Sequence, residues 1–205
     1  VPAGVAPDIA AAALLQGMTA HYLVNSTYQV VAGVQVLVHA AAGGVGQLLV
    51  QLAKAKGAHV IATVGSAEKA AIAESLGADA VILYDEVSDL AAAVRDASSG
   101  GVHVAYDGVG KATFEASLAS LRRRGLLALF GSASGQVPPF DLQRLNAAGS
   151  LFVTRPTLAH YTATRAELLQ RSGAVFEAIA SGALRVAIGG RYFLDDAAEA
   201  YRALE

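Results

Sequence analysis

The chain has 205 residues and a mass of 20.8 kDa, which suits a single large domain. Hydrophobic residues make up 54% of it and charged residues 16%, a balance that excludes intrinsic disorder. The net charge of -2 gives no electrostatic footprint for nucleic acid. The lack of cysteine excludes a disulfide scaffold and a thiolate metal site, and it fits a reducing, cytoplasmic compartment.

Residues 9–53 contain no Asp, Glu, Lys or Arg, which raises the question of a membrane span. Glycines and polar residues such as Gln16, His21 and Asn25 interrupt this stretch, so it lacks the run of about 20 apolar residues that a span needs. We therefore expect no membrane contact. The chain begins without Met or a signal-peptide pattern and stops inside a helical pattern, so we expect a piece of a longer protein.

Apolar periodicity predicts alternating helices and strands. The first half is expected to hold a helix capped by Asp8, a helix at 19–28, a strand at 36–39, a helix from Val45 to the stop at Gly57, a strand at 59–64, a helix at 66–76, a strand at 80–83 and a helix at 86–97. The second half is expected to hold a strand at 102–106, a helix at 112–123, a strand at 126–130, a short helix at 141–146, a strand at 151–154, helices at 164–181 and 195–204, and a possible strand at 191–193.

This alternation is typical of βαβ units and a parallel sheet. Strands such as Val36-Leu37-Val38 are apolar on both faces, as a sheet covered on both sides requires. We therefore predict an α/β fold, a doubly wound Rossmann-type sheet of six parallel strands with helices on both faces. Residues 1–205 should form one domain, in which 1–32 is a helical lead-in.

The central motif is Ala41-x-Gly43-x-x-Gly46, which lies between a predicted strand and an amphipathic helix. Gly43 allows the backbone to approach a pyrophosphate, Gly46 allows close packing of helix and strand, and free N–H groups at the helix start face the anion. The alternative is a glycine-rich turn without a ligand. The strand–turn–helix context favours a dinucleotide site.

The end of the second strand indicates which dinucleotide is bound. NAD sites usually place Asp or Glu about 20 residues beyond the glycines, on the ribose 2′-hydroxyl. Here the strand ends Thr63-Val64-Gly65-Ser66, without an acid. The Gly65 N–H, the Ser66 hydroxyl and the Lys69 ammonium would hold a 2′-phosphate, although Lys69 could also be an ordinary solvated helix lysine. We predict NADP(H).

Several motifs resemble the zinc-independent quinone oxidoreductases of the medium-chain dehydrogenase/reductase superfamily, the zeta-crystallin-like group. They are His39-Ala-Ala-Ala-Gly-Gly-Val-Gly46, Gly17-Met-Thr-Ala-His-Tyr22, Tyr106-Asp-Gly-Val-Gly110, Arg124-Gly-Leu126, Phe130-Gly-Ser132 and Gly149-Ser-Leu-Phe-Val-Thr-Arg-Pro156. The resemblance implies hydride transfer from NADPH to a quinone or other activated enone, usually by a homodimer.

The resemblance also implies roles for individual residues. The pyrophosphate would meet Gly44 and Val45 in the turn Ala42-Gly43-Gly44-Val45-Gly46, and the 2′-phosphate would meet Ser66 and Lys69 beside Gly65. Tyr84 would pack near the adenosine. The nicotinamide end would lie among Thr19, Phe130, Gly131, Ser132, Phe152, Val153 and Thr154. Zinc-using relatives carry a Cys ligand where this chain has Gln16, so no metal is expected.

The chain departs from the resemblance in lacking the N-terminal barrel-like domain that forms the other wall of the cleft. We therefore expect weak cofactor binding and little or no turnover from this piece, and the catalytic residues stay unknown. Two other readings remain: an enoyl reductase module of a polyketide synthase, and a module that senses NADP(H) without chemistry.

Other signals carry less. The five histidines show no metal-ligand spacing, and Tyr22 and Tyr106 are expected to be structural, so no general acid is assigned. Asp107 stands where the fourth strand ends, and it could touch the cofactor or cap the following turn. The strand at 151–154 would be an apolar sheet edge, at which a second copy could pair to form a homodimer.

Overall fold

The computed structural model describes residues 1–204. Six strands form one sheet: β1 (Gln35–Val38), β2 (His59–Val64), β3 (Ala80–Leu83), β4 (Val102–Asp107), β5 (Leu121–Leu129) and β6 (Phe152–Thr154). The helices are α1 (Pro7–Tyr22), α2 (Gly44–Ala55), α3 (Ala67–Ser75), α4 (Leu90–Ala97), α5 (Phe114–Ser120), α6 (Gln143–Ala147), α7 (Leu158–Tyr161), α8 (Arg165–Ala180) and α9 (Ala197–Leu204).

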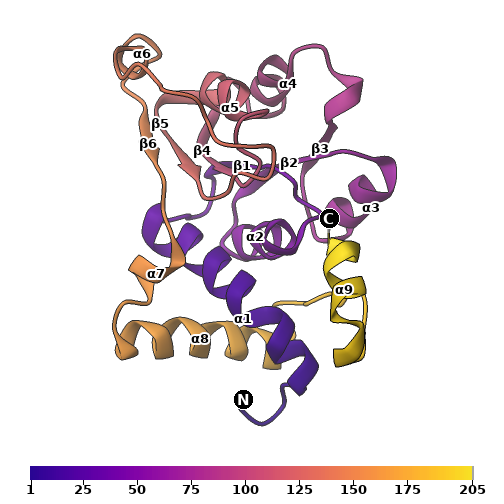
Figure 1. The fold of residues 1–205 in the computed structure, drawn as a ribbon. Helices are drawn as coiled ribbons and strands as arrows, with labels where there is room; N and C mark the ends of the chain where they lie inside the picture. The colour runs from indigo at the N-terminus through magenta and orange to yellow at the C-terminus, as the bar shows by residue number, and fades with distance from the viewer. Residues whose placement is uncertain (205) are drawn as a thin grey trace.

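All strand pairs are parallel, in the order β3-β2-β1-β4-β5-β6. Helices cover both faces: α4 and α5 lie on one, and α2 and α3, with α1 beyond α2, lie on the other (Figure 1). The predicted doubly wound α/β fold is confirmed. Because the order reverses between β1 and β4, a crevice is expected at their carboxyl ends.

Two apolar cores lie on opposite sides of the sheet because successive side chains of a strand point to opposite faces. Val36 and Val38 of β1 join the core that α1, α2 and α8 complete, whereas Leu37 joins the core beneath α4 and α5. This confirms the prediction that β1 is buried on both faces of the sheet.

The start of the chain differs from its prediction. Asp8 does not cap the first helix: Ala6 is the N-cap, Pro7 the first residue, and the Asp8 carboxylate pairs with Arg191. No separate helix forms at 19–28, since α1 continues into a π-helical turn, Leu23–Thr27. Gly17 does not interrupt the helix; a Cβ there would lie 2.7 Å from Val175 Cγ1, so this glycine lets α1 pack closely on α8.

Two later boundaries also differ, one predicted strand is absent and one helix was not predicted. The helix predicted at 86–97 begins at Leu90, because Asp89 caps it by accepting the Ala92 N–H. The helix predicted at 112–123 ends at Ser120, because Leu121 already pairs with Val102 in the sheet. Residues 191–193 form no strand, and the short helix α7 was not predicted.

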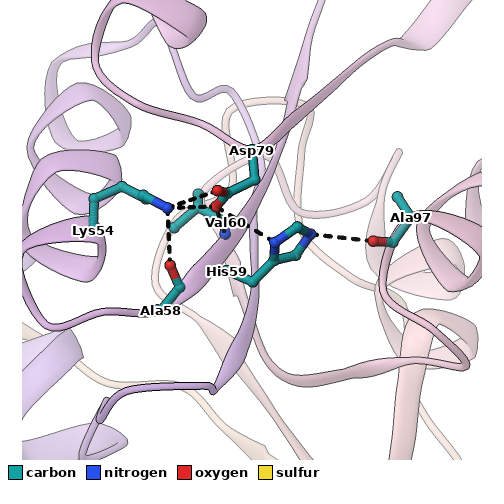
Figure 2. Close-up of polar contacts among 6 residues, drawn as sticks. All are labelled: Lys54, Ala58, His59, Val60, Asp79 and Ala97. Carbon is teal, nitrogen blue, oxygen red and sulfur yellow. Dashed lines mark hydrogen bonds and ion pairs between the residues drawn. The ribbon is translucent and has the colours of Figure 1, made fainter.

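A polar cluster fastens the amino edge of the sheet, opposite the crevice (Figure 2). The Asp79 carboxylate accepts hydrogen bonds from Lys54 Nζ and from the Val60 N–H, each at 2.7 Å. Burial alone would raise the Asp79 pKa, but these hydrogen bonds and the Lys54 charge lower it. The His59 ring continues the cluster to the Ala97 carbonyl, at 3.2 Å. The starts of β2 and β3 are thereby joined to the end of α2.

We predict that Asp79→Ala lowers the free energy of unfolding by about 1–3 kcal/mol, because the Val60 N–H and the Lys54 ammonium lose their acceptor. Urea unfolding measures the change. Glu74→Ala, an exposed acidic residue of α3, is the control and should stay within about 0.5 kcal/mol of the parent. Equal effects of the two substitutions would contradict a stabilising role of the Asp79 cluster.

Candidate functional site

The glycine turn joins β1 to α2 at the carboxyl edge of the sheet. The chain bends at Ala40, which is held in the left-handed region with φ 49°. The Ala40 carbonyl accepts the Gly43 N–H at 2.9 Å, and a Cβ on residue 46 would stand only 2.3 Å from that oxygen. The first turn of α2 therefore packs directly against the strand end. Gly43 and Gly44 remain exposed, so the helix presents its N-terminal N–H groups to solvent at this edge.

The end of β2 forms the neighbouring part of the edge. Ser66 is the N-cap of α3, and its Oγ accepts the Lys69 N–H at 3.3 Å. Gly65 has open space on its side-chain side, and the Lys69 side chain is exposed. Glu68 also lies in this first turn, and a hydrogen bond from Ser66 lowers its pKa. The edge thus offers a hydroxyl, an ammonium and free backbone, with one carboxylate close by.

A buried hydrogen-bonded chain runs beneath both turns; we call it the His39 network, formed by Tyr84, Thr63, His39, Ser117 and Asp107. His39 Nδ1 lies 2.8 Å from Thr63 Oγ1 and 3.2 Å from the Tyr84 hydroxyl. On the other side of the ring, Nε2 lies 3.0 Å from Ser117 Oγ, and that hydroxyl donates to Asp107 Oδ2 at 2.7 Å.

Asp107 caps the turn that follows β4. Its carboxylate accepts the N–H groups of Val109 and Gly110 at 2.8 and 2.9 Å, and the hydroxyls of Thr113 and Ser117. The side chain is wholly buried, and four donors are enough to satisfy a carboxylate there. Of the two roles left open for Asp107, the structure therefore supports the cap.

Burial sets the protonation of the network. It lowers the pKa of His39 to about 4, although the nearby Asp107 charge acts in the opposite direction. Burial also raises the pKa of Tyr84, again against the hydrogen bonds from Thr63 and the Ala40 N–H. At neutral pH the imidazole and the phenol are therefore both uncharged.

A cavity of about 490 Å³ lies where the other predicted residues gather. Thr19 from α1 and Phe130 after β5 line it, together with Tyr22 and the segment 155–158 after β6. Thr19 itself donates its hydroxyl to the Leu15 carbonyl at 2.7 Å. Gly131 and Ser132 line an adjacent cavity of about 300 Å³. Arg155 lines both cavities, and its guanidinium donates to the Leu129 carbonyl at 3.0 Å.

The predicted residues do not all share one surface. Phe152 and Val153 are the first two residues of β6, level with Leu126 and Leu127, and they expose 58% and 37% of their surface along the sheet edge. Only Thr154, the last residue of the strand, borders the segment that lines the cavity. Ala42 is half-buried and its carbonyl accepts the Gln47 side chain.

Four residues of this region were not predicted from the sequence: His39, Ser117, Thr113 and Arg155. His39 and Arg155 stand in motifs that were recognised, but their contacts come from other strands and could not be inferred from spacing. Ser117 lies on an apolar helix face between Phe114 and Leu118, where a serine is a weak signal for a buried partner.

Within residues 1–204, no group of three or more His, Cys, Asp or Glu side chains could hold a metal ion. In the same part of the chain, no helix has both the length and the apolar character needed to cross a membrane.

Comparison with known proteins adds a family and several relatives. The family model described as zinc-binding dehydrogenase matches residues 44–171. Quinone oxidoreductase 1 of Escherichia coli K12 is 46% identical over 208 residues, which cover 100% of this chain and 63% of the relative. A 2-haloacrylate reductase of a Burkholderia species is 43% identical over 191 residues, 92% of this chain and 57% of the relative. The chain thus spans less than two-thirds of these relatives' length.

The fold has a close match among solved structures. The mycobacterial protein Rv1454c in complex with NADPH superimposes with a TM-score of 0.95 at 54% identity, covering 100% of this chain and 63% of that chain. The relatives confirm the resemblance to quinone oxidoreductases of the medium-chain dehydrogenase/reductase superfamily. From the family match over more than half of its length, the chain belongs to the zinc-binding dehydrogenase family.

Proposed function

We propose that this chain is the NADP(H)-binding domain of a reductase that transfers hydride from NADPH to a quinone or another activated enone. The observation that carries the proposal is the glycine turn, where Gly46 packs against Ala40 and the start of α2 stays open at the crevice. The relatives described as quinone oxidoreductases and 2-haloacrylate reductase support the substrate class.

The residues present fit the cofactor. The Gly43 N–H already donates to the Ala40 carbonyl, so the donors left for a phosphate oxygen are the next N–H groups of α2, which begins at the exposed Gly44 beside the Gln16 side chain. The exposed Lys69 and the Ser66 hydroxyl, beside the uncovered Gly65, fit a 2′-phosphate. Glu68 is the opposing feature, because a phosphate would compete with this carboxylate for the Ser66 hydroxyl.

Each part of the crevice has a defined task in this proposal. The turn from Ala42 to Gly46 holds the pyrophosphate, and the half-buried Tyr84 borders the adenosine end. Thr19, Phe130, the segment Gly131–Ser132 and Thr154 at the end of β6 orient the nicotinamide end and keep water from it, whereas Phe152 and Val153 face the sheet edge. The nicotinamide, when bound, supplies the hydride; the protein's contribution is orientation and shielding. No general acid is assigned among the described residues.

We also propose the setting in which the domain works. Residues 1–205 form one cofactor domain, with 1–32 as a helical lead-in from the junction with a barrel-like domain that supplies the other wall of the cleft. A cytoplasmic location goes with this proposal and is compatible with the lack of cysteine. We propose a homodimer through β6, whose exposed Phe152 and Val153 leave an apolar sheet edge.

The activity is tested by supplying the second wall. A longer protein that joins this chain to a barrel-like domain should oxidise NADPH when 1,4-benzoquinone is added, whereas the 205-residue chain alone should bind NADPH weakly and turn over little. NADPH binding by the longer protein without any oxidation would favour a sensing module instead.

We predict that Lys69→Ala weakens NADPH binding about tenfold and leaves NADH binding nearly unchanged. An ammonium–phosphate hydrogen bond contributes about 1.5–3 kcal/mol, and solvent around this exposed residue places the effect at the lower end. Calorimetric titration of both coenzymes measures it. Lys56→Ala removes the same charge at the far end of α2 and serves as the control. An equal loss of affinity for NADPH and NADH would contradict the assignment of Lys69 to the 2′-phosphate.

We predict that Phe152→Glu converts a dimer into a monomer, because a charge on an edge strand opposes pairing with a second copy. Light scattering gives the mass before and after the change. Leu142→Glu introduces the same charge at another exposed apolar residue and should leave the mass unchanged. A monomeric parent protein would contradict the proposed dimer at once.

A further inference from the structure

The contacts of Ser117 fix the order of protons on one side of the His39 network. A carboxylate only accepts, so the single Ser117 proton goes to Asp107 Oδ2 at 2.7 Å. Ser117 Oγ must then accept at its other contact, which makes His39 Nε2 the protonated ring nitrogen. His39 Nδ1 is left as an acceptor for a hydroxyl of Thr63 or Tyr84. The tautomer of His39 is thereby fixed by the bonds around it.

One end of the network holds the glycine turn. The Tyr84 hydroxyl accepts the Ala40 N–H at 3.1 Å, and Thr63 Oγ1 also donates to it at 2.8 Å. Ala40 is in the left-handed region, which costs an L-residue energy that its neighbours must offset. The same residue supplies the carbonyl on which Gly43 and the first turn of α2 rest. The Tyr84 hydroxyl therefore supports the bend from which the turn starts.

The other end holds two loops at the nicotinamide side. The Asp107 carboxylate fixes the N–H groups of Val109 and Gly110. The Asp107 carbonyl accepts the N–H of Phe130 at 2.9 Å and that of Gly131 at 3.3 Å. The Asp107 side chain thus joins the loop after β4 to the network, and the main chain of the same residue holds the loop after β5. Tyr84 adds the turn after β3.

The placement argues against a purely stabilising role. His39, Thr63, Ser117 and Asp107 are each at most 1% exposed, and they are half of the eight polar or charged residues buried in the described part of the chain. A buried polar chain specifies geometry more than it stabilises, since well-packed apolar residues commonly stabilise a core as much. This one lies directly under the crevice rather than elsewhere in the fold.

We propose that Tyr84, His39 and Ser117 are positioning residues, which act as one unit to hold the glycine turn and the loops after β4 and β5 in the single arrangement that fits a dinucleotide. This inference rests on the proposed function. Its consequence is that a break at either end of the network weakens binding of the whole coenzyme, and that a second break adds little.

The test compares Tyr84→Phe, Ser117→Ala and the double variant in the full chain. Each single change should raise the NADPH Kd about three- to tenfold. The NADPH Kd of the double variant should be at most about twice that of the single variant with the higher Kd. Tyr106→Phe and Ser120→Ala are matched controls, because their buried hydroxyls donate to the Leu23 and Ala116 carbonyls and not to the network. The controls should leave the NADPH Kd unchanged.

Urea unfolding of each variant separates positioning from stability, and a second measurement tests the proton order. Nitrogen NMR of the histidine rings should show His39 protonated at Nε2 in the parent protein and should show that this preference is lost in Ser117→Ala. Tyr84 is only half-buried, so Tyr84→Phe still tests the proposal if Ser117→Ala does not fold.

The outcomes are distinguishable. Variants with a lower unfolding midpoint but an unchanged NADPH Kd would overturn the positioning role and leave the proposed function intact. Multiplying losses in the double variant, or a His39 proton on Nδ1, would overturn the claim of a single unit. A parent protein that does not bind NADPH would overturn the proposed function itself, and this inference with it.

Discussion

The structure depends on the approach of α2 to the end of β1. A side chain at position 46 would place its Cβ 2.3 Å from the Ala40 carbonyl oxygen, so only glycine lets the helix begin this close to the sheet. That contact sets the direction of α2 and leaves its first N–H groups at the point where the strand order reverses. In an open α/β sheet this is where a ligand meets backbone donors rather than side chains.

The apolar cores and the His39 network determine different parts of the structure. The cores follow from strands that are apolar on both faces, and they determine which helices cover which side. They do not determine the shape of the loops at the carboxyl edge. That is the task of the His39 network, whose bonds link the turn after β1 to the loop after β4. Site geometry therefore depends on polar contacts between strands that are distant in sequence.

The difference between the apolar cores and the His39 network explains what could be predicted from the sequence. Strand positions and α2 were predictable because their apolar periods are local, and the glycine spacing identified the turn. The boundaries of α4 and α5 were missed because Asp89 and the Leu121–Val102 pairing compete with helix propensity there. The partners of His39 could not be predicted, since they come from the end of β2, the turn after β3 and the middle of α5. The role of Asp107 became clear only from its four donors.

A crystal structure of the chain soaked with NADPH tests the central claim most directly. Density for the pyrophosphate should lie against the N–H groups at the start of α2, with the 2′-phosphate beside Ser66 and the Lys69 ammonium. An empty crevice at saturating coenzyme, or an adenosine ribose bound through the Glu68 carboxylate in place of the ammonium, would contradict the account.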